Sequence, residues 1–186
     1  MIKRLFLALN LPKNIISELE PILIKLQKAN KNKPIKWVEP QNLHLTLHFL
    51  GNVAEEKIEA IKQSLEPIIS QFESLNYQVT TEIEAFPDLQ NPRVIFLKLI
   101  ELNEQQTQKL QKAIGIELEK IGFDLDKRLF RLHLTLGRVK FKTSISIPNF
   151  IIHNSEFRIN SVDLMESQLN QQGPIYQIIR QFNLKD

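Results

Sequence analysis

Cysteine is absent from the 186 residues of this sequence. Its absence excludes a disulfide framework, a thiol nucleophile and a thiolate metal site. Any chemistry therefore has to come from histidine, carboxylate, hydroxyl, lysine or arginine side chains.

Long hydrophobic runs are also missing. No stretch reaches the roughly 18 consecutive apolar residues that cross a membrane. The opening "MIKRLFLALNLPKN" has a short apolar stretch and no small-residue cleavage site, so it does not read as a signal peptide. We expect a soluble, intracellular, cytoplasmic protein with no membrane partner. With 42% hydrophobic residues, the chain can build a sizeable core in one compact domain or two small fused lobes.

Three widespread catalytic motifs do not occur. The sequence contains no G-x-x-x-x-G-K-[ST] loop for ATP, no G-x-G-x-x-G for a dinucleotide and no G-x-S-x-G nucleophile elbow. A reaction that activates its substrate with ATP is thereby disfavoured.

The charge balance is mildly basic, with a formal net charge of +3 and a pI of about 9.1. Such a balance favours polyanionic partners without requiring them. A solvated basic face explains it equally well. The basic residues gather before and around two short segments of the chain: Lys25, Lys28, Lys31, Lys33, Lys36, and Lys127, Arg128, Arg131, Arg138, Lys140, Lys142.

Those two segments share the pentapeptide Leu-His-Leu-Thr-Leu, at residues 43–47 and 132–136. In a strand, successive side chains point to opposite faces. His44 and Thr46 therefore share one face, as do His133 and Thr135, while the leucines share the other. The pattern predicts leucines in the core and histidines on a polar face.

The rest of the chain alternates strands and helices. Helices are expected to carry apolar residues every three to four positions, and strands at every second position. Gly122 is a plausible C-terminal helix cap. Strands are predicted at 4–11, 77–86, 93–102, 155–169 and 174–184, and helices at about 12–28, 52–72 and 103–122.

The two halves resemble each other at one offset. Aligning Arg4 with Arg93 gives 89 residues, and aligning His44 with His133 gives the same 89. This predicts an internal duplication that makes two lobes, although short apolar strings can also match by chance. If a pseudo-twofold axis relates the lobes, the two histidine faces can look at each other across a cleft.

Paired histidines suit phosphoryl chemistry without a metal. One neutral imidazole can take a proton from the nucleophile while the other, protonated, donates to the leaving oxygen. His44 and His48 have the four-residue spacing of a helical zinc pair, but on a strand they would be about 13 Å apart. We therefore expect His48 not to be a ligand, and His153, which lacks a companion threonine, to be a surface or structural residue.

Longer stretches around these motifs resemble a known family. The stretches "RLFLALNLP", "WVEPQNLHLTLHFLGNV", "NPRVIFLKL", "FRLHLTLGRVK" and "ESQLNQQGPIY" are similar to the 2H phosphoesterase superfamily. The closer resemblance is to its LigT-like RNA 2′,3′-cyclic phosphodiesterases, also described as 2′-5′ RNA ligases. It implies an α+β fold in which residues 1–186 form a single domain of two interleaved lobes. Two antiparallel sheets would form a central cleft with the helices packed outside.

The resemblance also implies an activity. A terminal 2′,3′-cyclic phosphate on RNA would be opened to a 2′-phosphomonoester with no metal and no cofactor, with possible reversal to form a 2′-5′ linkage. By similarity, His44 is the acid for the departing O3′ and His133 the base for water. Thr46 and Thr135 would bind the phosphate. The partner would be an RNA or oligonucleotide end, and the protein would act as a monomer.

Two arginines are further candidates for substrate binding. Arg138 matches an arginine of the family, but five residues from His133 it falls on the opposite strand face unless the strand bends or ends at Gly137. Arg131 shares the face of His133 and would meet the RNA backbone. Where the family usually has proline before the second histidine, this chain has Leu132.

Ser167 and Tyr176 also match family positions, and Tyr176 is expected to pack rather than react.

Two other readings stay open at this point. One keeps the fold and changes the substrate to another small cyclic phosphate, such as an ADP-ribose cyclic phosphate, or to a 2′-5′ oligonucleotide. The other is a non-catalytic RNA-binding module that uses the basic loops. Kinetics measured side by side on these substrates would distinguish the first alternative from an RNA cyclic phosphodiesterase. Tight RNA binding without turnover would support the second alternative.

Overall fold

Two antiparallel sheets make up the centre of the molecule in the computed structural model, which describes residues 1–153, 155–170 and 173–186. All seven strand pairings in the described residues are antiparallel. Sheet A has the order β3 (His44–Ala54), β1 (Ile2–Asn10), β8 (Ser161–Leu169) and β9 (Pro174–Asn183). Sheet B has the order β2 (Ile35–Trp37), β6 (Leu134–Val139), β5 (Val94–Glu101), β4 (Leu75–Phe86) and β7 (Glu156–Ile159).

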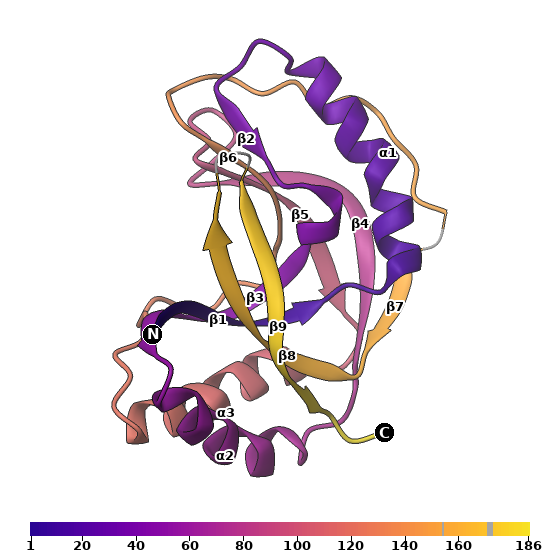
Figure 1. Ribbon diagram of the computed structural model, residues 1–186. Coiled ribbons are helices and arrows are strands. Elements are labelled where there is room, and N and C mark those ends of the chain that lie inside the picture. Colours follow the sequence, from indigo (N-terminus) through magenta and orange to yellow (C-terminus); the bar gives the residue numbers. More distant parts are fainter. Residues whose placement is uncertain (154, 171–172) are drawn as a thin grey trace.

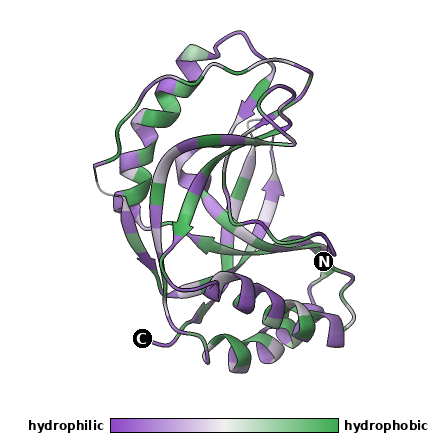
Figure 2. Cartoon of the chain, turned by 180° about the vertical axis from the view of Figure 1, so that it is seen from behind, coloured by the Kyte–Doolittle hydropathy of each residue, from purple (hydrophilic) through white to green (hydrophobic). Residues whose placement is uncertain are grey.

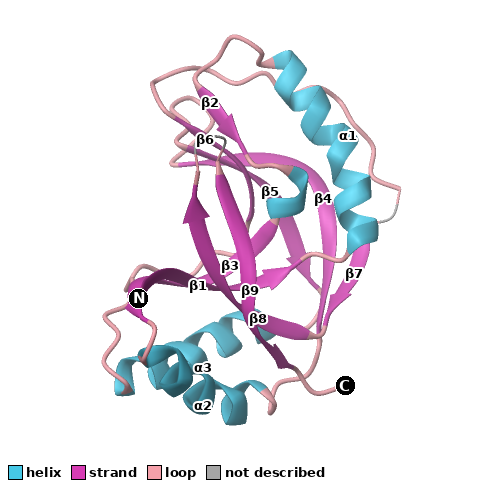
Figure 3. Ribbon diagram, in the orientation of Figure 1, coloured by secondary structure: helices cyan, strands magenta, loops and turns pink. Residues whose placement is uncertain are grey.

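The helices cover the outer sides of the sheets. Helices α2 (Lys57–Ile69) and α3 (Gln106–Lys120) pack against each other and against sheet A, while α1 (Lys13–Ala29) lies beside sheet B (Figure 1). Figure 2 shows hydrophobic and hydrophilic residues alternating along each helix, as expected for helices with one buried face. The predicted α+β class, with two antiparallel sheets and helices outside, is confirmed (Figure 3). In the described chain, none of the helices combines the length and hydrophobicity needed to cross a membrane.

The connection from β6 to β7 also covers sheet B. It runs in extended form beside α1 (Figure 1), where Asn30 fixes it at the end of that helix. Asn30 Nδ2 donates to the backbone oxygens of Leu26 and Ser146, each at 2.8 Å, and its Oδ1 accepts from Ser146 N. Because Asn30 is only 2% exposed, these bonds satisfy a side chain that water does not reach.

The leucines of the two pentapeptides lie in the core as predicted. Leu43, Leu45, Leu47, Leu134 and Leu136 are all buried and join one contiguous cluster that includes the inner faces of the helices. Leu132 is half-buried against the same cluster. A second, small cluster of Phe6, Ala8 and Met165 lies on the other face of sheet A, with Tyr176 packed against it.

The predicted cap at Gly122 is confirmed. Its φ of +87° is the left-handed conformation that glycine adopts without strain. Gly122 N donates to Glu119 O and Phe123 N to Leu118 O, which is the Schellman pattern at a helix end. Helix α3 therefore ends where the sequence indicated.

Two of the predicted elements differ most from the structure. The strand expected over 155–169 is two strands: β7 pairs with β4 in sheet B, and β8 pairs with β1 in sheet A. The chain changes sheets at Asn160, which an alternating pattern cannot reveal because both parts alternate. The helix expected over 52–72 begins only at Lys57. Residues 52–54 continue β3 instead, because β1 extends far enough to pair with them.

Candidate active site

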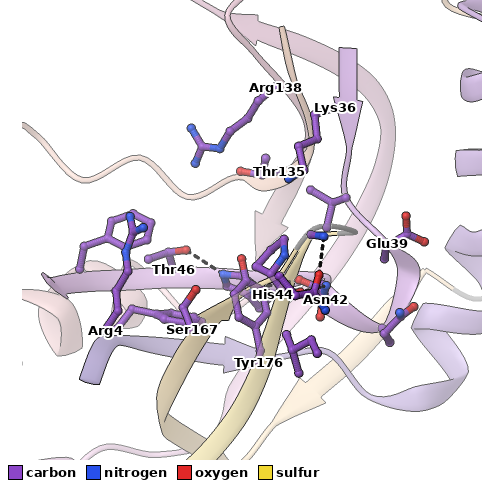
Figure 4. A pocket seen from close by; sticks show the side chains of 18 of the residues that line it. Arg4, Lys36, Glu39, Asn42, His44, Thr46, Thr135, Arg138, Ser167 and Tyr176 are labelled. Carbon is purple, nitrogen blue, oxygen red and sulfur yellow. Dashed lines mark hydrogen bonds between the residues drawn. The ribbon is translucent and has the colours of Figure 1, made fainter. Parts of the chain in front are cut away.

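A cleft of about 880 Å³ opens between the two sheets. Strands β1, β3 and β9 of sheet A line one side, and β2 and β6 of sheet B line the other. In Figure 4, Thr135, Arg138 and Lys36 extend from one side toward Thr46, His44 and Tyr176 on the other. The cleft faces away from the leucine core, so polar side chains from both pentapeptides can lie in it.

The imidazole of His44 is held by two hydrogen bonds. Its Nδ1 lies 2.7 Å from the backbone oxygen of Asn42, in the short helix η1 (Pro40–Asn42). A carbonyl only accepts hydrogen bonds, so Nδ1 carries a proton and Nε2 points the other way. Nε2 lies 3.0 Å from Thr46 Oγ1 (Figure 4), which places the threonine hydroxyl beside the second ring nitrogen.

His133 is held in the same manner, one residue before β6 begins. Its Nδ1 lies 2.6 Å from the backbone oxygen of Arg131, again two residues upstream in the chain. The ring therefore also carries its proton on Nδ1 and leaves Nε2 unused by this bond. His133 is not among the residues that line the cleft, but Thr135, two residues further on, is.

Each imidazole rests against two aromatic rings. The ring of His44 is 5.1 Å from Phe6 and 5.3 Å from Tyr176, between centroids. The ring of His133 is 5.1 Å from Phe86 and 5.4 Å from Phe96. Three of these four contacts are near-perpendicular, which is a favoured geometry for aromatic pairs. The packing and the backbone bond together fix the orientation of both rings.

The environment favours the neutral form of both imidazoles. Burial lowers the pKa of His44, the bond to Asn42 raises it, and the positive charges of Arg138 and His133 lower it further. Burial and Arg138 likewise lower the pKa of His133, against the bond to Arg131. Because Arg138 acts on both rings and His133 acts on His44, the three groups lie within one electrostatic neighbourhood.

A β-bulge turns Arg138 into the cleft. Thr135 pairs with Phe96 and Gly137 with Ile95, so Leu136 is an extra residue with no partner on β5. The bulge reverses the alternation of β6, and Arg138 consequently lines the same cleft as Thr135. The bend that the sequence required for Arg138 is therefore present.

The first pentapeptide strand contains a bulge at the matching place. Ala8 pairs with Thr46 and Leu7 with His48, which leaves Leu47 unpaired. Phe49 thereby lines the cleft, five residues after His44 as Arg138 is five after His133. His48 turns to the buried side instead, where its Nε2 donates to Gln111 O at 2.8 Å.

Only some of the other sequence candidates line the cleft. Arg131 does not line it, and its guanidinium stands over the ring of Phe86 at 5.5 Å. Ser167 and Tyr176 do line it, and Tyr176 packs on Phe6 and His44. His153 is exposed, and its backbone N–H donates to Glu18 Oε1. Within the described ranges, no three His, Asp or Glu side chains gather as a metal ion would need.

Several cleft residues were not singled out from the sequence. Lys36 was only one of many basic loop residues, and Arg4 served only to align the two halves. Phe6, which lines the cleft, packs on His44, and Phe96, which does not line it, packs on His133. Alternation along β1 could have indicated two of them. Arg4, Phe6 and Ala8 share one face of this strand, and Ala8 pairs with Thr46, which lines the cleft.

Comparison with known proteins gives the family. The model of the LigT like Phosphoesterase family matches residues 9–96 and 100–176. The chain therefore belongs to the LigT-like phosphoesterases, within the 2H phosphoesterases. Among solved structures, TT0787 of Thermus thermophilus superposes with a TM-score of 0.81 at 24% identity, over 98% of both chains. Escherichia coli LigT in complex with 3′-AMP does so with 0.81 at 22%, over 100% of both. Both likenesses show a shared fold.

The related sequences extend over nearly the whole chain. The RNA 2′,3′-cyclic phosphodiesterase of Archaeoglobus fulgidus is 34% identical and covers 96% of this chain and 99% of its own. The enzyme with the same activity from Methanocaldococcus jannaschii is 35% identical, again over 96% and 99%. The one from Bacillus subtilis is 30% identical over 89% and 91%.

Proposed function

We propose that this protein is a phosphodiesterase that opens a terminal 2′,3′-cyclic phosphate on RNA and leaves a 2′-phosphomonoester. The observation that carries the proposal is the matched setting of His44 and His133. In each ring Nδ1–H donates to the backbone carbonyl two residues upstream, so Nε2 is the nitrogen that can exchange a proton with a substrate. In His44 this nitrogen also contacts Thr46 Oγ1. The relatives with this activity, which match almost end to end, support the same assignment.

In the proposed reaction, water attacks the phosphorus and the bond from phosphorus to O3′ breaks. Neutral His133 takes the proton of the water through Nε2, and protonated His44 gives its Nε2 proton to O3′. The products are a 2′-phosphate and a free 3′-hydroxyl, so protons and charges balance. If a 5′-hydroxyl replaces water, the same groups would take its proton, break the bond from phosphorus to O3′ and form a 2′-5′ linkage.

Substrate binding favours the protonated form of the histidine that acts as the acid. In the free protein burial, reinforced by Arg138, holds the pKa of both histidines below the usual value. A bound phosphate brings a negative charge close to the rings and raises the pKa of whichever ring faces it. Thr46, Thr135 and Arg138 are proposed to donate to the non-bridging oxygens, where charge grows during the reaction.

The test is hydrolysis of a short RNA with a 2′,3′-cyclic end in the presence of EDTA. We expect turnover to a 2′-phosphate end, and a loss of about 10²- to 10⁴-fold in kcat for His44→Ala and for His133→Ala. His153→Ala is the matched control, because His153 is exposed and outside the cleft. Tight RNA binding without turnover in the wild type would overturn the proposal in favour of a binding module. Faster turnover of a small cyclic phosphate without an RNA chain would show that the proposed RNA substrate is wrong.

A further inference from the structure

The edge of sheet B presents two cations side by side to the cleft. In the pairing of β2 with β6, Lys36 lies directly opposite Arg138, and both line the cleft. Residues that are directly opposite on antiparallel strands have Cβ atoms about 5 Å apart, and like charges there destabilise the sheet. The ion pairs of the described residues involve other cations, and none brings a carboxylate within 4.0 Å of Lys36 or Arg138.

Lys36 is exposed, and its ammonium extends over the cleft. Lys36 Nζ comes within 4.0 Å of the place where a Cβ on Gly173 would stand, next to the start of β9 in sheet A. The lysine therefore reaches from one sheet toward the other. Figure 4 shows its side chain entering the pocket alongside Arg138 and Thr135.

The charges in the cleft exceed what one cyclic phosphate needs. A phosphodiester carries a single negative charge, and Arg138 already acts on both histidines beside which that phosphate is proposed to bind. Among the described lining residues, Arg4, Lys36 and Arg138 are cations and Glu39 is the carboxylate. If Arg138 binds the reacting phosphate, the positive charge of Lys36 remains available to bind a second anionic group of the substrate.

We infer that Lys36 binds the phosphodiester one nucleotide upstream of the cyclic end, so that the site prefers an oligonucleotide to a mononucleoside cyclic phosphate. The inference rests on the proposed function for the position of the first phosphate. Arg138 and Lys36 then contact successive phosphates of one strand, as their places on neighbouring strands allow. Lys36 is a specificity-determining residue that takes no part in proton transfer.

The kinetic test compares adenosine 2′,3′-cyclic phosphate with the 3′-5′-linked dinucleotide ApA that ends in the same 2′,3′-cyclic phosphate. We expect Lys36→Gln to lower kcat/KM on the dinucleotide by about tenfold, the effect of one charge-assisted contact, and on the mononucleotide by less than about twofold. Lys36→Arg should restore the dinucleotide rate. Lys31→Gln removes an exposed charge from the loop that precedes β2, outside the cleft, and should change neither rate.

The salt dependence gives a readout that a structural defect would not mimic. For a single strand, log affinity falls with log salt by about 0.7 for each phosphate contact. The wild-type affinity should therefore fall more steeply with salt for the dinucleotide than for the mononucleotide, and Lys36→Gln should abolish the difference. An equal loss on both substrates, or a preference removed by Arg4→Gln and not by Lys36→Gln, would overturn the inference.

A binding measurement separates this inference from the proposed function. Trp37, the single tryptophan, follows Lys36 and lines the cleft, so its fluorescence reports occupancy. Diadenosine 2′-phosphate should bind the wild type more tightly than adenosine 2′-phosphate, and Lys36→Gln should remove that advantage. If the wild type binds in this way but turns nothing over, the proposed function fails and the Lys36 contact stands. Equal binding of the two compounds to the wild type would refute the contact itself.

Discussion

The imidazoles of His44 and His133 are oriented by the backbone rather than by acidic side chains. In each case a carbonyl two residues upstream accepts the Nδ1 proton. A carbonyl fixes the tautomer without adding a full negative charge, so it opposes the lowering of the pKa by burial only partly. Arg138 then adjusts the pKa of both rings in the same direction.

Replacing Arg138 with glutamine should move the pH profile upward. The guanidinium opposes protonation of both rings, so its removal raises the pKa of both, while burial continues to lower them. The profile of kcat/KM reports the free protein, and we expect its acid and alkaline limbs to shift to higher pH together. The height of the profile should also fall because a phosphate contact is lost.

The matched control is Lys142→Gln, which removes an exposed cation outside the cleft and should leave both midpoints in place. Unchanged midpoints in Arg138→Gln would contradict an electrostatic role for this arginine.

The histidines and threonines could be predicted from the sequence because alternation puts them on one strand face. Their partners could not. The carbonyls of Asn42 and Arg131 act through the backbone and have no sequence signature. Lys36 faces the cleft only because a three-residue strand pairs with β6, and a strand that short does not show alternation.

At the scale of elements, the bulges decide what faces the cleft. Leu47 in β3 and Leu136 in β6 each stand three residues after a histidine and have no partner in the pairing. A bulge reverses the side-chain alternation. Phe49 and Arg138 therefore face the cleft, although each is five residues after a histidine and strict alternation would put it on the opposite face of the strand. A sequence reading by strict alternation fails at such positions.

The duplication of the two halves stays a prediction. The corresponding threonines, Thr46 and Thr135, are 89 residues apart, and so are the bulged leucines. Their partners Ala8 and Phe96 are 88 residues apart, one fewer than the offset that the arginines of the first strands gave. The matching bulges support two lobes built alike.

A second element-scale feature joins β3 to α3. A Cβ on Gly115 would come within 3.2 Å of His48 Cε1, and the His48 ring is held by Gln111 O. Alanine in a helix is normally about 1 kcal/mol more favourable than glycine. Here we expect Gly115→Ala to lower the free energy of unfolding by about 1 kcal/mol, because the pinned ring cannot give way without strain.

Urea unfolding of a double-mutant cycle checks this expectation. In a His48→Ala background the obstacle is gone, and Gly115→Ala should become stabilising. If Gly115→Ala has the same effect in both backgrounds, His48 and Gly115 do not interact as described.

At the scale of the whole molecule, the cleft exists because the chain returns to sheet A after building sheet B. Strands β1 and β3 come from the first half, but β8 and β9 complete their sheet after β7 has closed sheet B. The change of sheet at Asn160 was not predictable, since the alternating pattern continues through it. The α+β class and the helix-covered sheets were expected from the resemblance to the family, whereas the periodicity of the apolar residues predicted only the separate strands and helices.

The central claim is that His44, at the start of β3 in sheet A, and His133, just before β6 of sheet B, share one anion. The chain has four histidines, so their ring proton signals can be followed individually by NMR while inorganic phosphate is added. The account predicts that the signals of His44 and His133 shift with one common dissociation constant, while those of buried His48 and exposed His153 stay in place. A shift of only one of the pair, or two different dissociation constants, would contradict it.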